Sequence, residues 1–571
     1  MALPKKIWKI SRFDKGIGNI NAEGIFWWAQ GLDFEATPPY IRVASKMIKE
    51  TDSAAVLTLA DIYWGVIFES TNYAVNMLDG KFFKFSYPSW SEVHDNPNAW
   101  GGLGLFGDED FLYYASNNYA GRVPKNWTLQ TDWLDSWQSF NVSNSAELCP
   151  ITKFLKFICF GNQRYLAVWD TGASTWNATR ITLPPGYVIK WLKSLTDYLV
   201  ISAHHNADGS ALFFWDGISQ TYNRVLQLPQ VKSLAGVVDK NRLYVITGDA
   251  WINLFDGSGL VKLARFPDIE LDANYASLIN INPDAVKVFQ GLILIGKGAS
   301  GFDFSKRFYP GGIWVYNPTT NALYFKHMMS HFAINNQSGY GVLAIGSIMI
   351  DQGGNIFRAA WNKGGGTGQY IIDNSMDAGS ARPYNWGAFL VTPLLDDEPY
   401  RRKRFIQSLL NFWKPLVDNS FARIVLKYNI TEQYQRDSRY ASGGTSNTFT
   451  LGFVPSYWEV GDEVTVLAGN GAVQIRHIQS ISGTTLTVDE SLYGGASYDS
   501  TSYLLLTKFK KIGVIKGNEN KEAVNKMLRF NARSKKIQLK IEIWSNAGFT
   551  GEWDMGIADI STVYIPDRII K

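Results

Sequence analysis

A short phrase returns along the middle of this chain: an apolar or aromatic run that ends in Asp-Gly or a close variant. The copies are Val75–Gly80, Leu166–Gly172, Leu212–Gly217, Ile252–Gly257 and Ile313–Pro318. In the three best copies Asp170, Asp216 and Asp256 are 46 and 40 residues apart. About 40 to 50 residues make one four-stranded propeller blade, and Asp-Gly suits the tight turn of a hairpin. The repeat therefore predicts a propeller, and it indicates no activity.

Composition supports an all-β fold. Among 571 residues there are 21 Trp, 28 Tyr, 33 Phe and 51 Gly. Aromatic residues fit the half-buried surfaces of sheets, and glycine fits the turns between strands. The net charge of +4 is too small to indicate a nucleic-acid binder held by bulk electrostatics. Cys149 and Cys159 lie in apolar stretches, which predicts buried free thiols in a protein from a reducing cytoplasm.

Changes of pattern along the chain predict four regions, as its length also suggests. Residues 1–50 are expected to form an N-terminal arm, and residues 51–375 an irregular six- or seven-bladed β-propeller. Residues 376–430 and 511–571 contain matching basic-aromatic and alternating strands, which predict a C-terminal β-sandwich in two parts. Residues 431–510 interrupt that sandwich as an inserted small β-barrel or Ig-like module.

No segment of the chain predicts export or membrane insertion. The opening Met1–Lys6 is not followed by the apolar region of a secretory signal. No uninterrupted apolar run of about 18 residues is present, so no membrane span is expected. We expect a protein that is made in a cytoplasm and stays soluble there, or leaves by a route such as lysis.

No pattern identifies catalytic, cofactor-binding or metal-binding residues, so none is predicted and we expect no enzyme. His327 and His331 have the i, i+4 spacing of a helical metal site, but no Glu completes a zinc motif and the spacing means little in strands. We interpret His204–Gly209 as a solvated loop between strands. Gly364–Gly368 lacks the following Lys that a phosphate-binding loop needs.

Two further motifs favour structural interpretations. Asp170–Trp176 resembles the Asp-box of sialidase propellers, although Val168 stands where that box has Ser or Thr. The box is a structural turn, and no spacing identifies the acid–nucleophile pair of a glycosidase. The basic run Arg401–Arg404 follows the acidic run Asp396–Glu398. It could contact DNA phosphates, but a solvated turn or an intersubunit salt-bridge edge is the favoured interpretation.

The whole layout resembles the tail nozzle (tail tubular) proteins of short-tailed bacteriophages. The points of similarity are the irregular propeller, the split C-terminal part and the segments Phe13–Ile17, Thr392-Pro393, Met527–Phe530, Val460–Val464 and Ile481–Val488. The resemblance implies a structural virion protein of the tail, assembled in the host cytoplasm. It implies a homohexameric ring below adaptor and portal proteins that lines the DNA exit channel, passes double-stranded DNA and anchors tail fibres. The family has no catalytic residues to carry over.

Two other functions stay open. Aromatic side chains on exposed loops could bind surface glycans, as in a receptor-binding adhesin of the tail tip, although such residues more simply fill blade cores and interfaces. A polysaccharide hydrolase is the third hypothesis. If the chain forms a ring, we expect a channel wall of mixed or mildly negative charge, because strong attraction would slow the passage of DNA.

Overall fold

The computed structural model is built of β-strands, with two short 3-10 helices, η1 (Gln130–Asp132) and η2 (Pro283–Ala285). The all-β class expected from the sequence is therefore confirmed. The structure describes residues 4–18, 24–35, 40–44, 47–52, 62–77, 79–98, 101–143, 147–205, 209–228, 231–266, 281–298, 311–327, 329, 344–362, 370–375, 388–395, 400–413, 415–416, 423–431, 436–468, 474–491, 497–520, 523–544 and 556–567.

Seven antiparallel blades follow one another along the chain, each running from its first strand to its last. Blade one is β7 (Trp64–Phe68), β8 (Thr71–Val75), β9 (Lys81–Ser86) and β10 (Ser89–Asp95), with β6 (Thr51–Asp52) parallel to β10. Blade two is β11 (Gly104–Gly107), β12 (Phe111–Ala115), β13 (Tyr119–Pro124) and β14 (Leu134–Ser139). Blade three is β15 (Ile151–Phe154), β16 (Phe157–Asn162), β17 (Tyr165–Asp170) and β18 (Thr175–Thr182).

The remaining blades have the same order of strands. Blade four is β19 (Tyr187–Ser194), β20 (Leu199–His205), β21 (Gly209–Trp215) and β22 (Arg224–Leu228). Blade five is β23 (Ser233–Asp239), β24 (Arg242–Thr247), β25 (Trp251–Phe255) and β26 (Leu260–Arg265). Blade six is β27 (Val286–Phe289), β28 (Leu292–Lys297), β29 (Gly312–Asn317) and β30 (Ala322–His327). Blade seven is β31 (Ala344–Ile350), β32 (Phe357–Asn362), β33 (Tyr370–Asn374) and a strand from far upstream, β5 (Ile48–Lys49).

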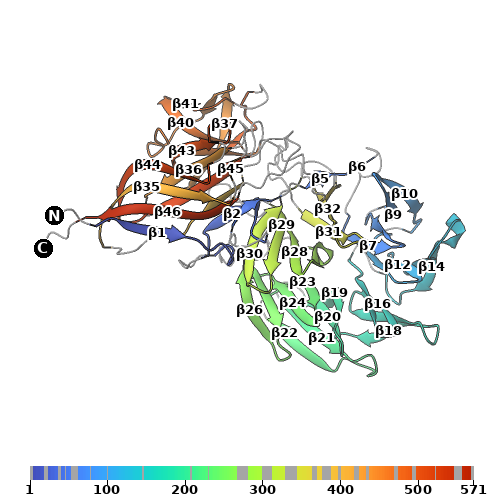
Figure 1. The fold of residues 1–571 in the computed structure, drawn as a ribbon. Helices are drawn as coiled ribbons and strands as arrows, with labels where there is room; N and C mark the ends of the chain where they lie inside the picture. Colours follow the sequence, from blue (N-terminus) through green and yellow to red (C-terminus); the bar gives the residue numbers. More distant parts are fainter. Residues whose placement is uncertain are drawn as a thin grey trace.

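The blades are arranged in a closed circuit. The first strands of neighbouring blades lie side by side from β7 through β11, β15, β19, β23 and β27 to β31, and β31 contacts β7 again (Figure 1). Inner strands are covered on both faces: β20 is buried along most of its length, whereas the outermost β22 alternates between exposed and half-buried residues. This arrangement is a seven-bladed β-propeller, within the range of six or seven expected from the repeat.

The N-terminal residues do not form a separate arm. Besides β5 and β6, they contribute β1 (Lys6–Ile10) and β2 (Trp28–Gln30) to two sheets of the C-terminal half, and β3 (Leu32–Asp33) pairs with β4 (Arg42–Val43). The strands β2 to β6 have only two or three residues, too few to produce a period in the sequence. The strands β1, β2 and β5 pair with strands that are distant in the chain, so the pattern did not identify those partners.

Two sheets form the C-terminal half. The first, called the terminal sheet below, has the order β1, β46 (Ile557–Pro566), β35 (Lys403–Phe412) and β44 (Asn525–Ser534). The second continues blade six: β30 pairs with β2, which is followed by β34 (Ala388–Val391), β45 (Gln538–Trp544), β36 (Arg423–Asn429) and β43 (Lys510–Lys516). We call this nine-stranded sheet the long sheet.

Apolar side chains from both C-terminal sheets belong to one core cluster, which also includes residues of blades five to seven. Phe405 and Leu410 of the terminal sheet and Ile424 and Ile541 of the long sheet are all buried in it. At its edge the ring centroids of Tyr428 and Phe530, one from each sheet, are 5.3 Å apart. The propeller and the C-terminal half therefore share a continuous interior.

A closed six-stranded barrel is inserted between β36 and β43. Its order is β37 (Arg436–Gly444), β38 (Thr448–Leu451), β41 (Thr485–Val488), β40 (Ile475–Ser482), β39 (Glu463–Ala468) and β42 (Tyr503–Thr507). Its own core contains Phe449, Trp458 and Tyr498. All its strands lie inside the range 431–510 expected for the inserted module. Among the described residues no helix is long and apolar enough to cross a membrane.

Candidate functional site

The repeated Asp-Gly phrase is a set of turns that join the third and fourth strands of blades three to six. In each turn the side-chain oxygen of the Asp or Asn accepts two backbone N–H groups; the residues are Asp170, Asp216, Asp256 and Asn317. In the third of these turns the hydrogen bonds lower the pKa of Asp256 to about 2. These acids are therefore engaged in shaping turns.

One copy of the phrase is not equivalent to the others. Asp79, at the end of Val75–Gly80, lies between the second and third strands of blade one, and its side chain accepts the N–H of Lys81. The sequence placed it in the same series because the local turn chemistry is the same. Its place in the blade depends on pairing that the phrase does not encode.

A buried polar cluster closes the propeller ring between blades one and seven. Arg358 of β32 donates from Nε to Glu50 at 2.7 Å and from Nη1 to Asn72 of β8 at 2.6 Å. Glu50 also accepts Trp90 Nε1 at 2.6 Å and Asn374 Nδ2 at 3.0 Å. The side chains of Arg358 and Glu50 are only 6% and 3% exposed. We call these five residues the closure cluster, because they connect Glu50, which lies between β5 and β6, with the first blade and the last blade.

Asp284 of η2 connects three blades near the innermost strands. Its Oδ2 accepts the Gly65 N–H of β7 at 2.9 Å and the Ser347 hydroxyl of β31 at 2.6 Å, and its Oδ1 is paired with Lys287 of β27. Lys193 of β19 lies in the same electrostatic environment. Loss of solvent and the charge of Lys287 lower the pKa of Lys193 to about 8. The arrangement holds blades six, seven and one together.

The histidines occupy structural positions where the structure describes them. His204 and His205 end strand β20 and Gly209 begins β21, so the expectation of a loop is wrong for these three residues, and residues 206–208 lie outside the described residues. His204 Nε2 donates to the Ser233 carbonyl at 2.9 Å, and burial lowers its pKa to about 4. His94 lies between Asp135 and Gln130 at 2.8 and 2.9 Å, and Trp133 stacks on its ring. His327 is buried, and His331 lies outside the described residues.

Metal and thiol chemistry also lack a site in the described part of the chain. Within it, no three His, Cys, Asp or Glu side chains are grouped so that they could hold an ion. Cys149 and Cys159 are buried and free, and burial raises the pKa of both thiols. Gly364–Gly368 and Asp396–Glu398 lie outside the described residues.

A second buried charged cluster fixes the barrel to the long sheet. Lys427 of β36 contacts Glu463 of the barrel at 2.7 Å and Glu542 of β45 at 2.5 Å. Lys540 contacts the same two carboxylates at 2.7 and 3.1 Å, and Thr507 donates to Glu463. All four charged side chains are at most 5% exposed. Burial alone would raise the pKa of Glu463, but the two lysines outweigh it and hold it well below its usual value. We call this group the barrel clamp.

The sequence contains a signal for the barrel clamp in its two buried strands. Lys427 interrupts the apolar run of β36, and Glu542 interrupts that of β45, and both strands are buried along most of their length. A charge inside a strand buried on both faces requires a partner of opposite charge. The sequence does not say which residue is that partner, because Glu463 belongs to an inserted module.

Lys403 and Arg404 of the basic run Arg401–Arg404 are the first residues of strand β35, so the expectation of a solvated turn is wrong for these two, whereas Arg401 and Arg402 precede the strand. Lys403 is buried and donates to the Lys535 carbonyl, and Arg401 donates to the Asp567 carbonyl. Arg404 is exposed and lies directly opposite Arg533 of β44. The run therefore belongs to a larger basic face, which the terminal sheet presents to solvent.

Most aromatic rings fill blade interiors and the contacts between blades. Trp137 of β14 and Trp169 of β17, for example, meet across blades two and three with ring centroids 4.7 Å apart. The barrel is different: Phe453 and Tyr457 are 58% and 46% exposed. Asp437 accepts from the Tyr457 hydroxyl and from Arg439, whose guanidinium lies 4.7 Å from the Phe453 ring. The candidate functional sites are therefore two surfaces. One is the basic face of the terminal sheet, and the other is the part of the barrel surface around Phe453 and Tyr457, which we call the barrel rim.

Comparison with known proteins adds little to this picture. No family model and no curated protein matches the chain. Similar solved structures include the WD40 β-propeller domain of Doa1, with a TM-score of 0.38, 13% identity and coverage of 60% of this chain and 98% of that chain. The Neurospora crassa Pan2 WD40 domain has a TM-score of 0.38, 9% identity and coverage of 58% and 95%. Scores this low carry no argument about function, and the propeller assignment depends on the strand pairing described above.

Proposed function

We propose that this protein is a structural component of a bacteriophage tail, without enzymatic activity, that assembles into a ring or nozzle. In that role it lines the DNA exit channel, contacts adaptor and portal-proximal proteins and anchors fibres. The observation that supports the proposal is where the buried charges lie. The closure cluster, Asp284 and the barrel clamp each join separate modules of the molecule.

A buried charged network lowers the stability of a fold unless every member has a partner. The position of such a network therefore indicates which parts of the fold have to stay in contact. Here they join the two ends of the propeller ring and attach the inserted barrel. A part that transmits force needs such junctions, whereas an active site needs a charged group that faces substrate. We further propose that the two C-terminal sheets act as a β-sandwich that supports the barrel as a contact arm for fibres or tip proteins.

The test uses purified phage particles that carry this gene. Mass spectrometry of the particles is expected to find the chain at several copies per particle, and immunogold labelling is expected to place it on the tail. The purified chain should form closed rings in negative-stain images at high protein concentration. Particles that lack the chain, while it accumulates in the infected cell, would overturn the proposal.

A receptor-binding adhesin is the second candidate, and the exposed pair Phe453 and Tyr457 on the barrel favours it. Aromatic rings held rigidly at a surface are suited to stacking on sugar rings. A glycan array would test this function, with Tyr457→Ala and Phe453→Ala expected to abolish binding. Tyr87→Ala is the matched control, because Tyr87 is 78% exposed on blade one, away from the barrel.

A further inference from the structure

Charge is concentrated on the terminal sheet. Its four strands contain seven basic residues, Lys6, Lys9, Lys403, Arg404, Lys526, Arg529 and Arg533, and one acidic residue, Asp559. The outward side chains of β44 are all exposed, and they include Arg529 and Arg533. Within a chain of net charge +4, this sheet is strongly basic.

The basic side chains are close together because of the strand register. Arg404 and Arg533 are direct cross-strand partners, and like charges in that position repel each other. Asp567 is 2.8 Å from Arg533 and offsets part of this repulsion. Arg529 has no acidic partner within the described part of the chain. Ile7 and Met527 are 67% and 44% exposed on the same sheet. Lys9 is 3.2 Å from Asp559 and Lys403 is buried, so the exposed positive charge of the face belongs mainly to Arg404, Arg529 and Arg533, beside these apolar side chains.

The opposite charge is found in blades one and two. Residues 62–140 contain nine acidic and four basic side chains. Glu109 and Asp110 are exposed in the turn between β11 and β12. The neighbouring loop presents Leu129, 62% exposed, and is held by Asp132, which accepts the N–H groups of Thr128 and Leu129 at 3.0 and 2.9 Å. An apolar tip therefore stands within an acidic surface.

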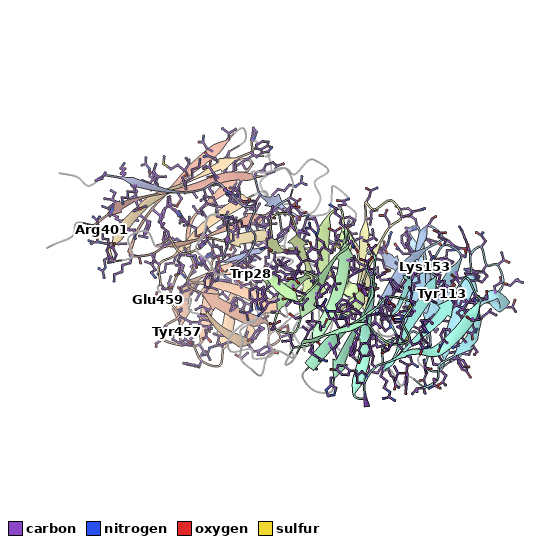
Figure 2. The ribbon with its side chains drawn as sticks, turned by 90° about the horizontal axis from the view of Figure 1, so that it is seen from below. Trp28, Tyr113, Lys153, Arg401, Tyr457 and Glu459 are labelled. Carbon is purple, nitrogen blue, oxygen red and sulfur yellow. The ribbon has the colours of Figure 1, made fainter. Side chains whose placement is uncertain are left out.

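The two surfaces cannot meet within one molecule. The terminal sheet lies at one end of the elongated chain, and blades one and two lie at the other (Figure 1). Arg401, beside the terminal sheet, and Lys153, which pairs with Asp108 of blade two, are far apart in the second view as well (Figure 2). A contact between the surfaces therefore requires a second copy.

We propose that the terminal sheet of one copy docks on the acidic surface of blades one and two of the next copy. The occupant of the basic face is a second copy of this chain, because the chain itself carries a surface of complementary charge with an exposed apolar tip. Such a head-to-tail contact uses different surfaces on the two partners and closes into a ring when the rotation between copies permits. The inference rests on the proposed ring function and names the surfaces that build it.

Reversing the charge of each surface in turn tests the proposal. Mass photometry and light scattering at low salt should detect oligomers of the full chain, and high salt should weaken them at least tenfold because exposed charges are screened. Arg404→Glu with Arg529→Glu, and separately Glu109→Lys with Asp110→Lys, should each give monomers. An equimolar mixture of the two variants should recover oligomers, because each mixed contact pairs either two native or two reversed surfaces. That recovery also demonstrates that both variants are folded.

Lys240→Glu with Arg242→Glu is the matched control for the arginine variant, because both side chains are exposed where β23 turns into β24 and the change in charge is the same. This variant should assemble like the native chain. The proposal is overturned if the native chain is monomeric at every concentration and salt, or if either charge variant assembles normally. It is also overturned if Arg404→Glu with Arg529→Glu loses binding to a duplex DNA probe and keeps its oligomers. If rings persist in all variants, this inference fails and the proposed tail function is unaffected. If rings depend on charge but purified particles lack the chain, the tail function fails and this inference is unaffected.

Discussion

Arg358 and Glu50 form the ion pair on which closure of the propeller depends. Replacing Arg358 with Met leaves the Glu50 carboxylate buried with only neutral donors, and removing one partner of a buried pair costs about 3–5 kcal/mol. We expect a loss of that size in the free energy of unfolding, measured by urea denaturation. Adding Glu50→Gln should recover part of it, since no unpaired charge is then left.

The exposed pair Lys81 and Glu92 on blade one is the control for this prediction, with side chains 35% and 39% exposed. Lys81→Met should cost less than about 1 kcal/mol, because solvent screens exposed pairs. Equal losses in the two variants would contradict the role given to the closure cluster.

His204 makes the stability of blade four depend on pH. Its folded pKa of about 4 is below the ordinary value of about 6.5, so the unfolded chain binds the proton more tightly. Stability is complete above pH 6.5 and falls as the pH drops from 6.5 toward 4. His204→Gln keeps a donor for the Ser233 carbonyl and should remove about 1 kcal/mol of the difference in unfolding free energy between pH 7.5 and pH 5.

His94→Gln should act with the opposite sign. Burial disfavours charge on His94, but its hydrogen bonds with Asp135 and Gln130 outweigh burial and raise its pKa. Its contribution is therefore complete below about pH 6.5 and is lost as the pH rises through the raised value. Parallel pH profiles for the two variants would refute both assignments.

At the level of single residues, the sequence predicted turns better than charges. Asp216 and Asp256 were predicted correctly as turn residues because Asp-Gly chemistry is local. Glu50 and Arg358 were not singled out, because their contact is made only when the ring closes. Arg404 was visible as part of a basic run, but its neighbour Arg533 comes from a strand much later in the chain.

The barrel is the element whose attachment can be tested most directly. Glu463→Gln leaves Lys427 and Lys540 facing the single carboxylate of Glu542, and we expect a cost of about 3–5 kcal/mol for the unbalanced buried charge. Hydrogen exchange should become faster along β36 and β39 and stay unchanged in blades two to five. Glu459→Gln is the control, since Glu459 is 61% exposed beside Lys508 and Lys510.

Acid should weaken the same junction. The pKa of Glu463 is lowered in the folded protein, so its contribution is present above the unfolded value of about 4.5 and is lost as the pH falls below it. The protection factors of β39, in which the intrinsic pH dependence of exchange is divided out, should therefore fall between pH 4.5 and pH 3 in the native chain, and much less in Glu463→Gln. A native junction that is indifferent to this range would count against the clamp.

Strands that form an apolar or alternating run between turn residues could largely be predicted from the sequence, including the four-residue β41, and the strands of two or three residues could not. The blade strands and the inserted barrel are apolar or alternating runs separated by turn residues. β5 has two residues and β2 has three, so neither produces a pattern. Their pairing is decided by the rest of the fold, which offers each of them an open sheet edge.

The long sheet makes the whole molecule one continuous structure. β2 bridges β30 of the propeller and β34 of the C-terminal half, and the buried Trp28 contacts Trp314 of blade six with ring centroids 5.7 Å apart. Trp28 lies between the two halves (Figure 2). Since truncating a buried Trp typically costs about 3–5 kcal/mol, Trp28→Ala should split the single thermal transition expected of the native chain into two. Leu129→Ala, at an exposed site, should leave one transition; a native chain with two transitions would contradict the continuity.

The pairing of β1 with β46 has a consequence for the timing of synthesis. A ribosome adds roughly 5–20 residues per second, so Ile10 emerges on the order of a minute before its partner Ile560. Throughout that delay the terminal sheet lacks β46, the strand between β1 and β35. We therefore expect nascent and prematurely ended chains to form a propeller without a complete basic face. Copies can then associate through that face only after β46 has been translated.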